Sequence, residues 1–134
     1  MHRPQSKVLL HCERHGTLLE YSRLLNALSF FRVTPCSSLE EAKRLARSAA
    51  SFDYFVHDGF DGSEKSRNDL LAFKGRIKHI VLIGGVAEDK RAAMFHWAWL
   101  NRVPLLDILS KPLNIFRLND ALSFHHEIRD VEGA

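Results

Sequence analysis

The chain has 134 residues, of which 46% are hydrophobic and 26% are charged, and its formal net charge is +3. This size and composition are typical of one soluble globular domain with a single core. No apolar run approaches the roughly 20 residues that span a bilayer, and the first residues lack the apolar segment of a secretory signal. The two cysteines have neither disulfide-framework nor zinc-finger spacing, which favours a reduced, cytoplasmic protein. The basic residues are scattered among acids, so direct nucleic-acid binding has little support.

Strand-like and helix-like segments alternate along the chain. Short apolar runs predict strands at residues 7–11, 31–34, 54–57, 79–83 and 105–109. Apolar residues recur at helical spacing after each run, and the last helix follows Pro112. Thr17 with Glu20, and Ser38 with Glu41, have the spacing of helix capping boxes. Residues 58–63 are rich in turn formers and predict a loop.

This alternation predicts an α/β fold with a parallel sheet and helices on both sides. Right-handed crossovers leave few topologies, and we expect the flavodoxin-like (βα)5 three-layer sandwich with strand order 2-1-3-4-5. The run 79–83 is the most apolar, which indicates an inner strand buried on both faces. No repeat or linker divides the chain. We therefore expect a single domain over residues 1–134, with an ordered core from about residue 7 to about residue 128.

Residues with chemistry follow the predicted strands. Glu13 follows the first strand, Asp58 the third, and Lys111 the fifth. Since function gathers at the carboxyl ends of parallel strands, we expect these three side chains to lie in one pocket. Two carboxylates there repel each other unless a cation joins them, and Lys111 or a Mg²⁺ ion would supply that charge.

The order and spacing of these residues resemble the receiver domain of bacterial response regulators (CheY-like) over almost the whole chain. In that family two acids end the first strand, an aspartate ending the third strand accepts a phosphoryl group, and Thr or Ser ends the fourth. A Lys-Pro pair, usually with a cis peptide bond, follows the fifth. The resemblance implies that Asp58 is the phosphoacceptor, that Lys111 is its catalytic partner, and that Glu13 and Asp58 form a weak Mg²⁺ site.

Three positions depart from the pattern of the family. Cys12 replaces the first acid, Gly84 the hydroxyl residue, and Ile108 the usual aromatic of the fifth strand. A thiol suits Mg²⁺ poorly, and glycine cannot bond a phosphoryl oxygen. We therefore expect a degenerate receiver, or pseudo-receiver, in two-component phosphorelay signalling. It would be phosphorylated slowly or not at all, and would act through contacts with a cognate histidine kinase or other signalling protein rather than as an enzyme.

An aromatic stretch follows the fourth predicted strand, with Phe95, Trp97 and Trp99 close together. On a helix the two tryptophans lie about 200° apart, so both cannot face the sheet. One reading is that neighbouring segments bury the second ring. The other is a homodimer or partner surface, which the resemblance places on the fourth helix, fifth strand and fifth helix.

A second class of function stays open, namely a small flavodoxin-like protein that binds a nucleotide or a metal. Five residues together resemble transition-metal ligands in type: His11, Cys12, Glu13, His15 and His57. However, successive strand residues point to opposite faces, so His11 and Cys12 should not share a site, and neither should His57 and Asp58. We expect no membrane partner. The chain can equally be part of a larger regulator with a separate output domain.

Overall fold

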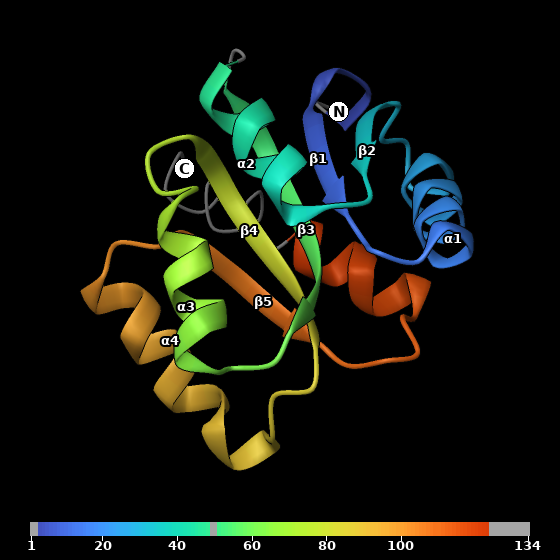
Figure 1. Ribbon diagram of the computed structural model, residues 1–134. Helices are drawn as coiled ribbons and strands as arrows, with labels where there is room; N and C mark the ends of the chain where they lie inside the picture. The colour runs from blue at the N-terminus through green and yellow to red at the C-terminus, as the bar shows by residue number, and fades with distance from the viewer. Residues whose placement is uncertain (1–2, 49–50, 124–134) are drawn as a thin grey trace, which may run out of the picture.

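The computed structural model describes residues 3–48 and 51–123 (Figure 1). Its strands are β1 (Lys7–His11), β2 (Arg32–Cys36), β3 (Phe52–Phe60), β4 (Ile77–Gly84) and β5 (Leu105–Leu109). Its helices are α1 (His15–Ala27), α2 (Leu39–Ser48), α3 (Glu64–Leu71) and α4 (Arg91–Leu100), with short 3-10 turns η1 (Arg3–Gln5) and η2 (Glu88–Lys90). Residues 115–123 form a further helix after β5. The predicted end of the ordered core, near residue 128, lies outside the described residues.

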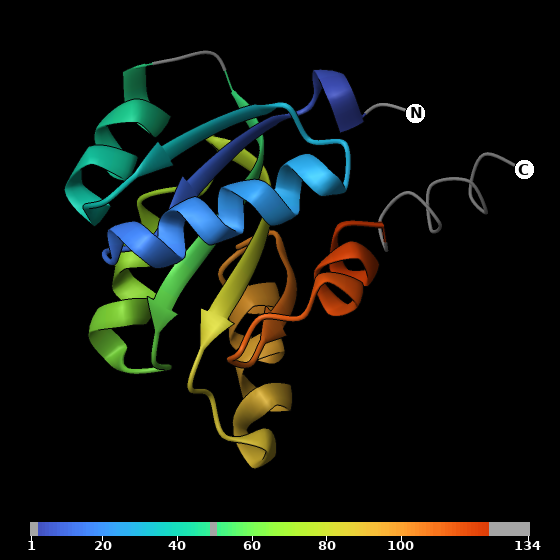
Figure 2. The same cartoon turned by 90° about the vertical axis from the view of Figure 1, so that its right-hand side faces the viewer.

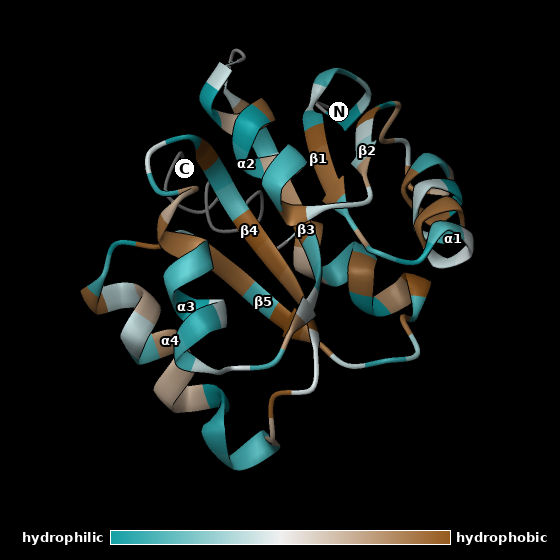
Figure 3. Cartoon of the chain, in the orientation of Figure 1, coloured by the Kyte–Doolittle hydropathy of each residue, from teal (hydrophilic) through white to brown (hydrophobic). Residues whose placement is uncertain are grey.

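All five strands are parallel and lie in the order β2-β1-β3-β4-β5, which confirms the predicted fold. One face of the sheet packs against α2, α3 and α4, and the other against α1 and the last helix (Figures 1 and 2). β4 is largely apolar, as its brown colour in Figure 3 shows, and successive residues such as Val81 and Leu82 enter opposite cores. The expectation of an inner strand buried on both faces is therefore confirmed. No helix in the described part of the chain is long and apolar enough to cross a membrane.

Two local predictions at the start of the chain are wrong. α1 begins at His15, so Thr17 lies inside the helix and does not cap it. β2 continues through Pro35 to Cys36, past the predicted end at residue 34. Because β2 is the edge strand, a proline there need not remove a bond of the sheet. The second predicted cap is present, since the backbone N–H of Glu41 donates to Ser38 Oγ at 3.1 Å.

The largest difference lies after Asp58. β3 runs on to Phe60, where the sequence predicted a loop, and Phe60 pairs with Gly84 of β4. The register of the two strands shifts between Asp58 and Phe60, where Gly59 has a φ of 103°. A positive φ of this size is open to glycine and strained for other residues, so Gly59 allows the irregularity. The Phe60 ring is buried under the helices of the α2–α4 face.

Candidate functional site

Asp58 lies near the carboxyl end of β3, and its side chain is almost completely buried. Its Oδ1 atom is 2.7 Å from Nζ of Lys111, which follows β5 and is about half exposed. The Lys111–Pro112 peptide bond is cis, as the family resemblance implied. The structure thus brings together the two side chains for which the family resemblance implies the roles of phosphoacceptor and catalytic lysine.

The second carboxylate oxygen of Asp58 is also occupied. Tyr21 of α1 donates its hydroxyl to Oδ2 at 2.9 Å, and the Cys12 thiol lies 3.5 Å from the same atom. Burial, and next the hydrogen bond to Asp58, raise the pKa of Tyr21, so its hydroxyl remains a donor. Burial likewise raises the pKa of Cys12, which keeps the weakly donating thiol form. The sequence patterns did not single out Tyr21 as part of this site; a phenol at a core-facing position of a helix was the signal available.

Glu13 is not part of this cluster. Its side chain is exposed, and it has no ion pair or hydrogen bond with any residue that the structure describes. Mg²⁺ requires an octahedral set of oxygen ligands, with carboxylate oxygens open to the ion. The oxygens of Asp58 already contact an ammonium, a hydroxyl and a thiol. As they are arranged here, these side chains do not fit a Mg²⁺ ion.

Gly84 occupies the position expected for the Thr or Ser of the family, and here the backbone of β3 fills the space. A Cβ atom at Gly84 would lie 1.8 Å from the carbonyl oxygen of Phe60. No side chain can stand there unless β3 moves. The missing hydroxyl at residue 84 is therefore coupled to the extension of β3 past Asp58.

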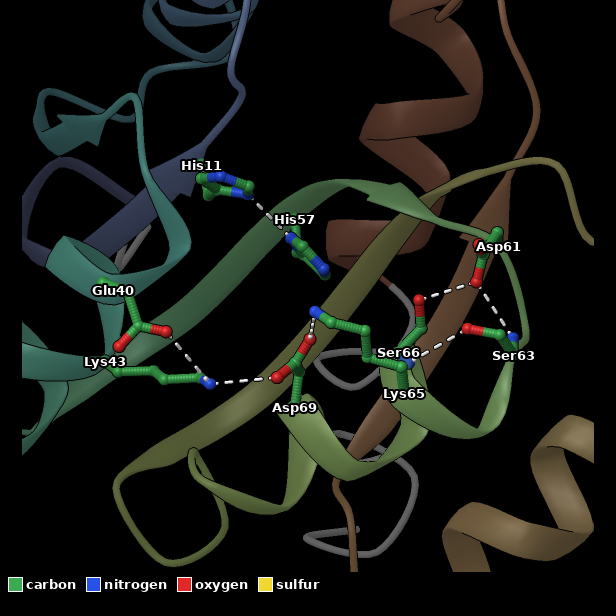
Figure 4. Close-up of polar contacts among 9 residues, drawn as sticks. All are labelled: His11, Glu40, Lys43, His57, Asp61, Ser63, Lys65, Ser66 and Asp69. Carbon is green, nitrogen blue, oxygen red and sulfur yellow. Dashed lines mark hydrogen bonds and ion pairs between the residues drawn. The ribbon is translucent and has the colours of Figure 1, made fainter.

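The side chain of His57 points to the opposite face of the sheet from that of Asp58, because successive residues of a strand alternate. The Nδ1 atoms of His11 and His57 are 2.9 Å apart (Figure 4), and the His57 ring stacks on Phe55. Burial lowers the pKa of both rings, for His57 to about 4. Within the described residues, no three His, Cys, Asp or Glu side chains form a group that could hold a metal ion. The prediction that neighbouring residues of β1 and β3 diverge is confirmed.

The aromatic residues of α4 have three different environments. Trp97 packs partly buried against the core, and Phe95 lies beneath the guanidinium of Arg91, 5.6 Å from the ring centroid. Trp99 is 80% exposed. Arg91 also holds α4 to β5, through Asp107 at 2.9 Å and through the carbonyl oxygen of Ile108. Of these three aromatic residues, Trp99 thus exposes by far the largest part of its side chain to solvent.

No family model matches the sequence, and no significant match occurs among curated proteins. Solved structures do match. A response regulator receiver protein from Sinorhizobium medicae is 27% identical, with a TM-score of 0.63 over 88% of this chain and 91% of that one. A response regulator from Burkholderia pseudomallei, with a phosphorylated aspartic acid and a calcium ion, is 18% identical, with a TM-score of 0.68 over 96% and 73%.

A putative pilus assembly protein from Burkholderia thailandensis is similar too. It is 19% identical, with a TM-score of 0.70 over 91% of this chain and 98% of that one. The same architecture therefore occurs in proteins described as receivers and in a protein described by a role in pilus assembly. This chain has the fold of CheY-like receiver domains.

Proposed function

We propose that this protein is a receiver-like signalling domain with an incomplete phosphorylation site, acting mainly through protein–protein contacts. The observation that supports this most strongly is the state of the Asp58 carboxylate. Lys111 contacts one oxygen, and Tyr21 and Cys12 contact the other. A phosphoacceptor needs one oxygen free to attack phosphorus, and a metal-assisted transfer needs the other to bind the ion.

The neighbouring residues support loss of the phosphate-driven switch as well. A ligand changes a conformational equilibrium only through contacts that differ between the two states. At Gly84 the Phe60 carbonyl occupies the space where a hydroxyl would meet a phosphoryl oxygen. At β5, Ile108 is a buried aliphatic residue with no aromatic ring to reorient. A phosphoryl group on Asp58 would thus have few partners through which to move α4.

The proposed contact surface is the end of α4, and its occupant is a signalling partner or a second copy of this chain. Trp99 and Leu100 are both exposed large hydrophobic residues, side by side in the sequence. Exposed aromatic residues are enriched at protein interfaces. Trp97 and Phe95 support this surface from the core side and contribute less area to a partner. A histidine kinase fits this role only if Asp58 still accepts phosphate.

The test compares the wild-type protein with the double variant Cys12→Asp, Tyr21→Phe, each incubated with Mg²⁺ and acetyl phosphate. Intact mass measures phosphoryl transfer, and NMR shifts with beryllofluoride measure the structural response. We expect little or no added phosphate on the wild-type protein. The double variant restores an acid and frees Oδ2 of Asp58, so its Mg²⁺ affinity and its phosphorylation should both rise.

Asp58→Asn in each background is the control, because it removes the only proposed acceptor. The wild-type protein should also show beryllofluoride shifts confined to the loops around Asp58. Stoichiometric phosphorylation of the wild-type protein, with shifts spread over α4, would overturn the proposal and identify a working phosphorylation switch.

A further inference from the structure

A pocket of about 430 Å³ lies between the segment that joins β3 to α3 and the segment that joins β4 to α4. Its volume is within the range of about 300–1,000 Å³ that small-molecule sites occupy. It is distinct from the Asp58–Lys111 pair, and neither of those two residues lines it. In Figure 1 both segments leave the same end of the sheet and lead into α3 and α4, which cover the same face.

The charges that line the pocket favour an anion. Arg67 and Lys90 both line it, and neither has an acidic partner within 4.0 Å among the described residues. Arg67 is held in place by a 3.0 Å hydrogen bond from Nη1 to the carbonyl of Gly62. Asp61 is the acid of the lining, and its Oδ1 atom accepts hydrogen bonds from the N–H of Ser63 and the hydroxyl of Ser66 (Figure 4). Two unpaired cations therefore face one acid that is already hydrogen-bonded.

Apart from Ser63 and backbone glycines, the rest of the lining is apolar, and it includes an aromatic ring. Val86, Met94 and Trp97 line the pocket together with Ala93, and Met94 is buried. An indole face stacks well on another flat ring, and it holds its place here because Trp97 packs against the core. We propose that this pocket binds a small aromatic carboxylate, with its ring against Trp97 and its carboxylate between Arg67 and Lys90.

Such a ligand would give the domain an input that does not depend on phosphorylation. It would bridge the segments that follow β3 and β4, and so would couple the positions of α3 and α4. The partner surface at Trp99 lies on α4 as well, beyond Trp97 on the same helix. This inference depends on the pocket alone, and it stands whether or not Asp58 accepts phosphate.

The test is an NMR titration of the full chain with naphthoate and with naphthamide, which match in shape and differ in charge. The reporters are the indole N–H of Trp97 and the backbone amides of Gly62 and Gly85, with the indole of Trp99 as an internal control. A ligand of this size that fits its site is expected to bind with a Kd of about 1 mM or lower. Naphthamide should bind about tenfold more weakly, because it lacks the charge that Arg67 and Lys90 attract.

Two alanines of α4 provide a matched pair of variants. Both are exposed, but only Ala93 lines the pocket. Ala93→Phe should fill the space and weaken naphthoate binding at least tenfold, whereas Ala92→Phe should leave it unchanged. Lys90→Met should weaken naphthoate by about fivefold, the factor expected of a partly exposed charge pair, and leave naphthamide unaffected.

Four results would overturn the inference. The first is the absence of any shift at the Trp97 indole at several millimolar naphthoate. The second is equal binding of naphthoate and naphthamide. The third is a set of shifts larger at Trp99 than at Trp97, and the fourth is an equal effect of the two alanine variants on binding. Either of the last two would place the ligand outside the pocket.

Discussion

Removing the Tyr21 hydroxyl is expected to lower the free energy of unfolding by about 2 kcal/mol, the middle of the range for a hydrogen bond to a charged group. Tyr21→Phe keeps the ring and its packing in the core and deletes only the donor to Oδ2 of Asp58. Asp58 is 5% exposed, so water cannot readily replace that donor. The one donor left on Oδ2 is the Cys12 thiol at 3.5 Å, which is weak. The loss should therefore not be offset locally.

Urea unfolding measures this change. For a domain of this size the slope of free energy against urea is about 2 kcal/mol per molar, so the midpoint should fall by about 1 M with an unchanged slope. The matched background is Asp58→Ala, in which the hydroxyl has already lost its acceptor. There Tyr21→Phe should be nearly neutral, and the double-mutant cycle should give a coupling energy of about 2 kcal/mol.

A coupling energy below about 0.5 kcal/mol would refute this reasoning, because distant and independent sites add to within that margin. It would mean that Tyr21 does not donate to Asp58 in solution. The carboxylate oxygen would then be free, and the strongest support for an inactive phosphorylation site would be lost.

Three further predictions concern other parts of the molecule. Gly84→Thr should lower the free energy of unfolding by about 3 kcal/mol or more in urea, because its Cβ would lie 1.8 Å from the Phe60 carbonyl oxygen. Gly85→Ala is the control, since there is open space around a Cβ at that position. Equal losses of stability in the two variants would contradict the argument. Burial lowers the pKa of His57 from 6.5 to about 4 in the folded protein. The stability that depends on neutral His57 is therefore fully present above about pH 6.5 and is lost as the pH falls toward 4. At pH 5 the free energy of unfolding should be lower by about 2 kcal/mol. Urea midpoints from about pH 8 to about pH 5 check this, and a flat profile would oppose it. Trp99→Ala should weaken self-association or partner binding in sedimentation experiments without shifting the unfolding midpoint, since the ring is 80% exposed; unchanged association would remove this residue from the interface.

A variant designed from the family pattern alone to regain phosphorylation would change the wrong pair of residues. The family pattern suggests adding a hydroxyl at Gly84 and an acid at Cys12. The structure shows that residue 84 has no room for a side chain while Phe60 pairs with it. It also shows that the Tyr21 hydroxyl occupies Oδ2 of Asp58, in addition to the replacement of the family's first acid by Cys12. The variant that we expect to be phosphorylated therefore changes Cys12 and Tyr21 together.

The sequence by itself determined the topology and the meeting of Asp58 with Lys111. Alternating strand and helix patterns allow few parallel arrangements, and residues that follow parallel strands meet at one edge of the sheet. It also determined that Trp97 and Trp99 face different ways, since two residues on a helix turn the side chain by about 200°.

The tertiary structure decided which groups surround the Asp58 carboxylate, because each of those contacts joins atoms from separate helices, strands or loops. A helical period places Tyr21 on the core face of α1 but cannot say that its hydroxyl meets the end of β3. The extension of β3 depends on pairing with β4, which no local pattern in residues 58–60 encodes. Which tryptophan packs inward depends on how α4 is rotated about its axis, and that depends on contacts between elements such as those of Arg91 with Asp107 and the carbonyl of Ile108. Local periodicity fixes the face of each element, whereas the partner on that face is fixed only when the elements pack.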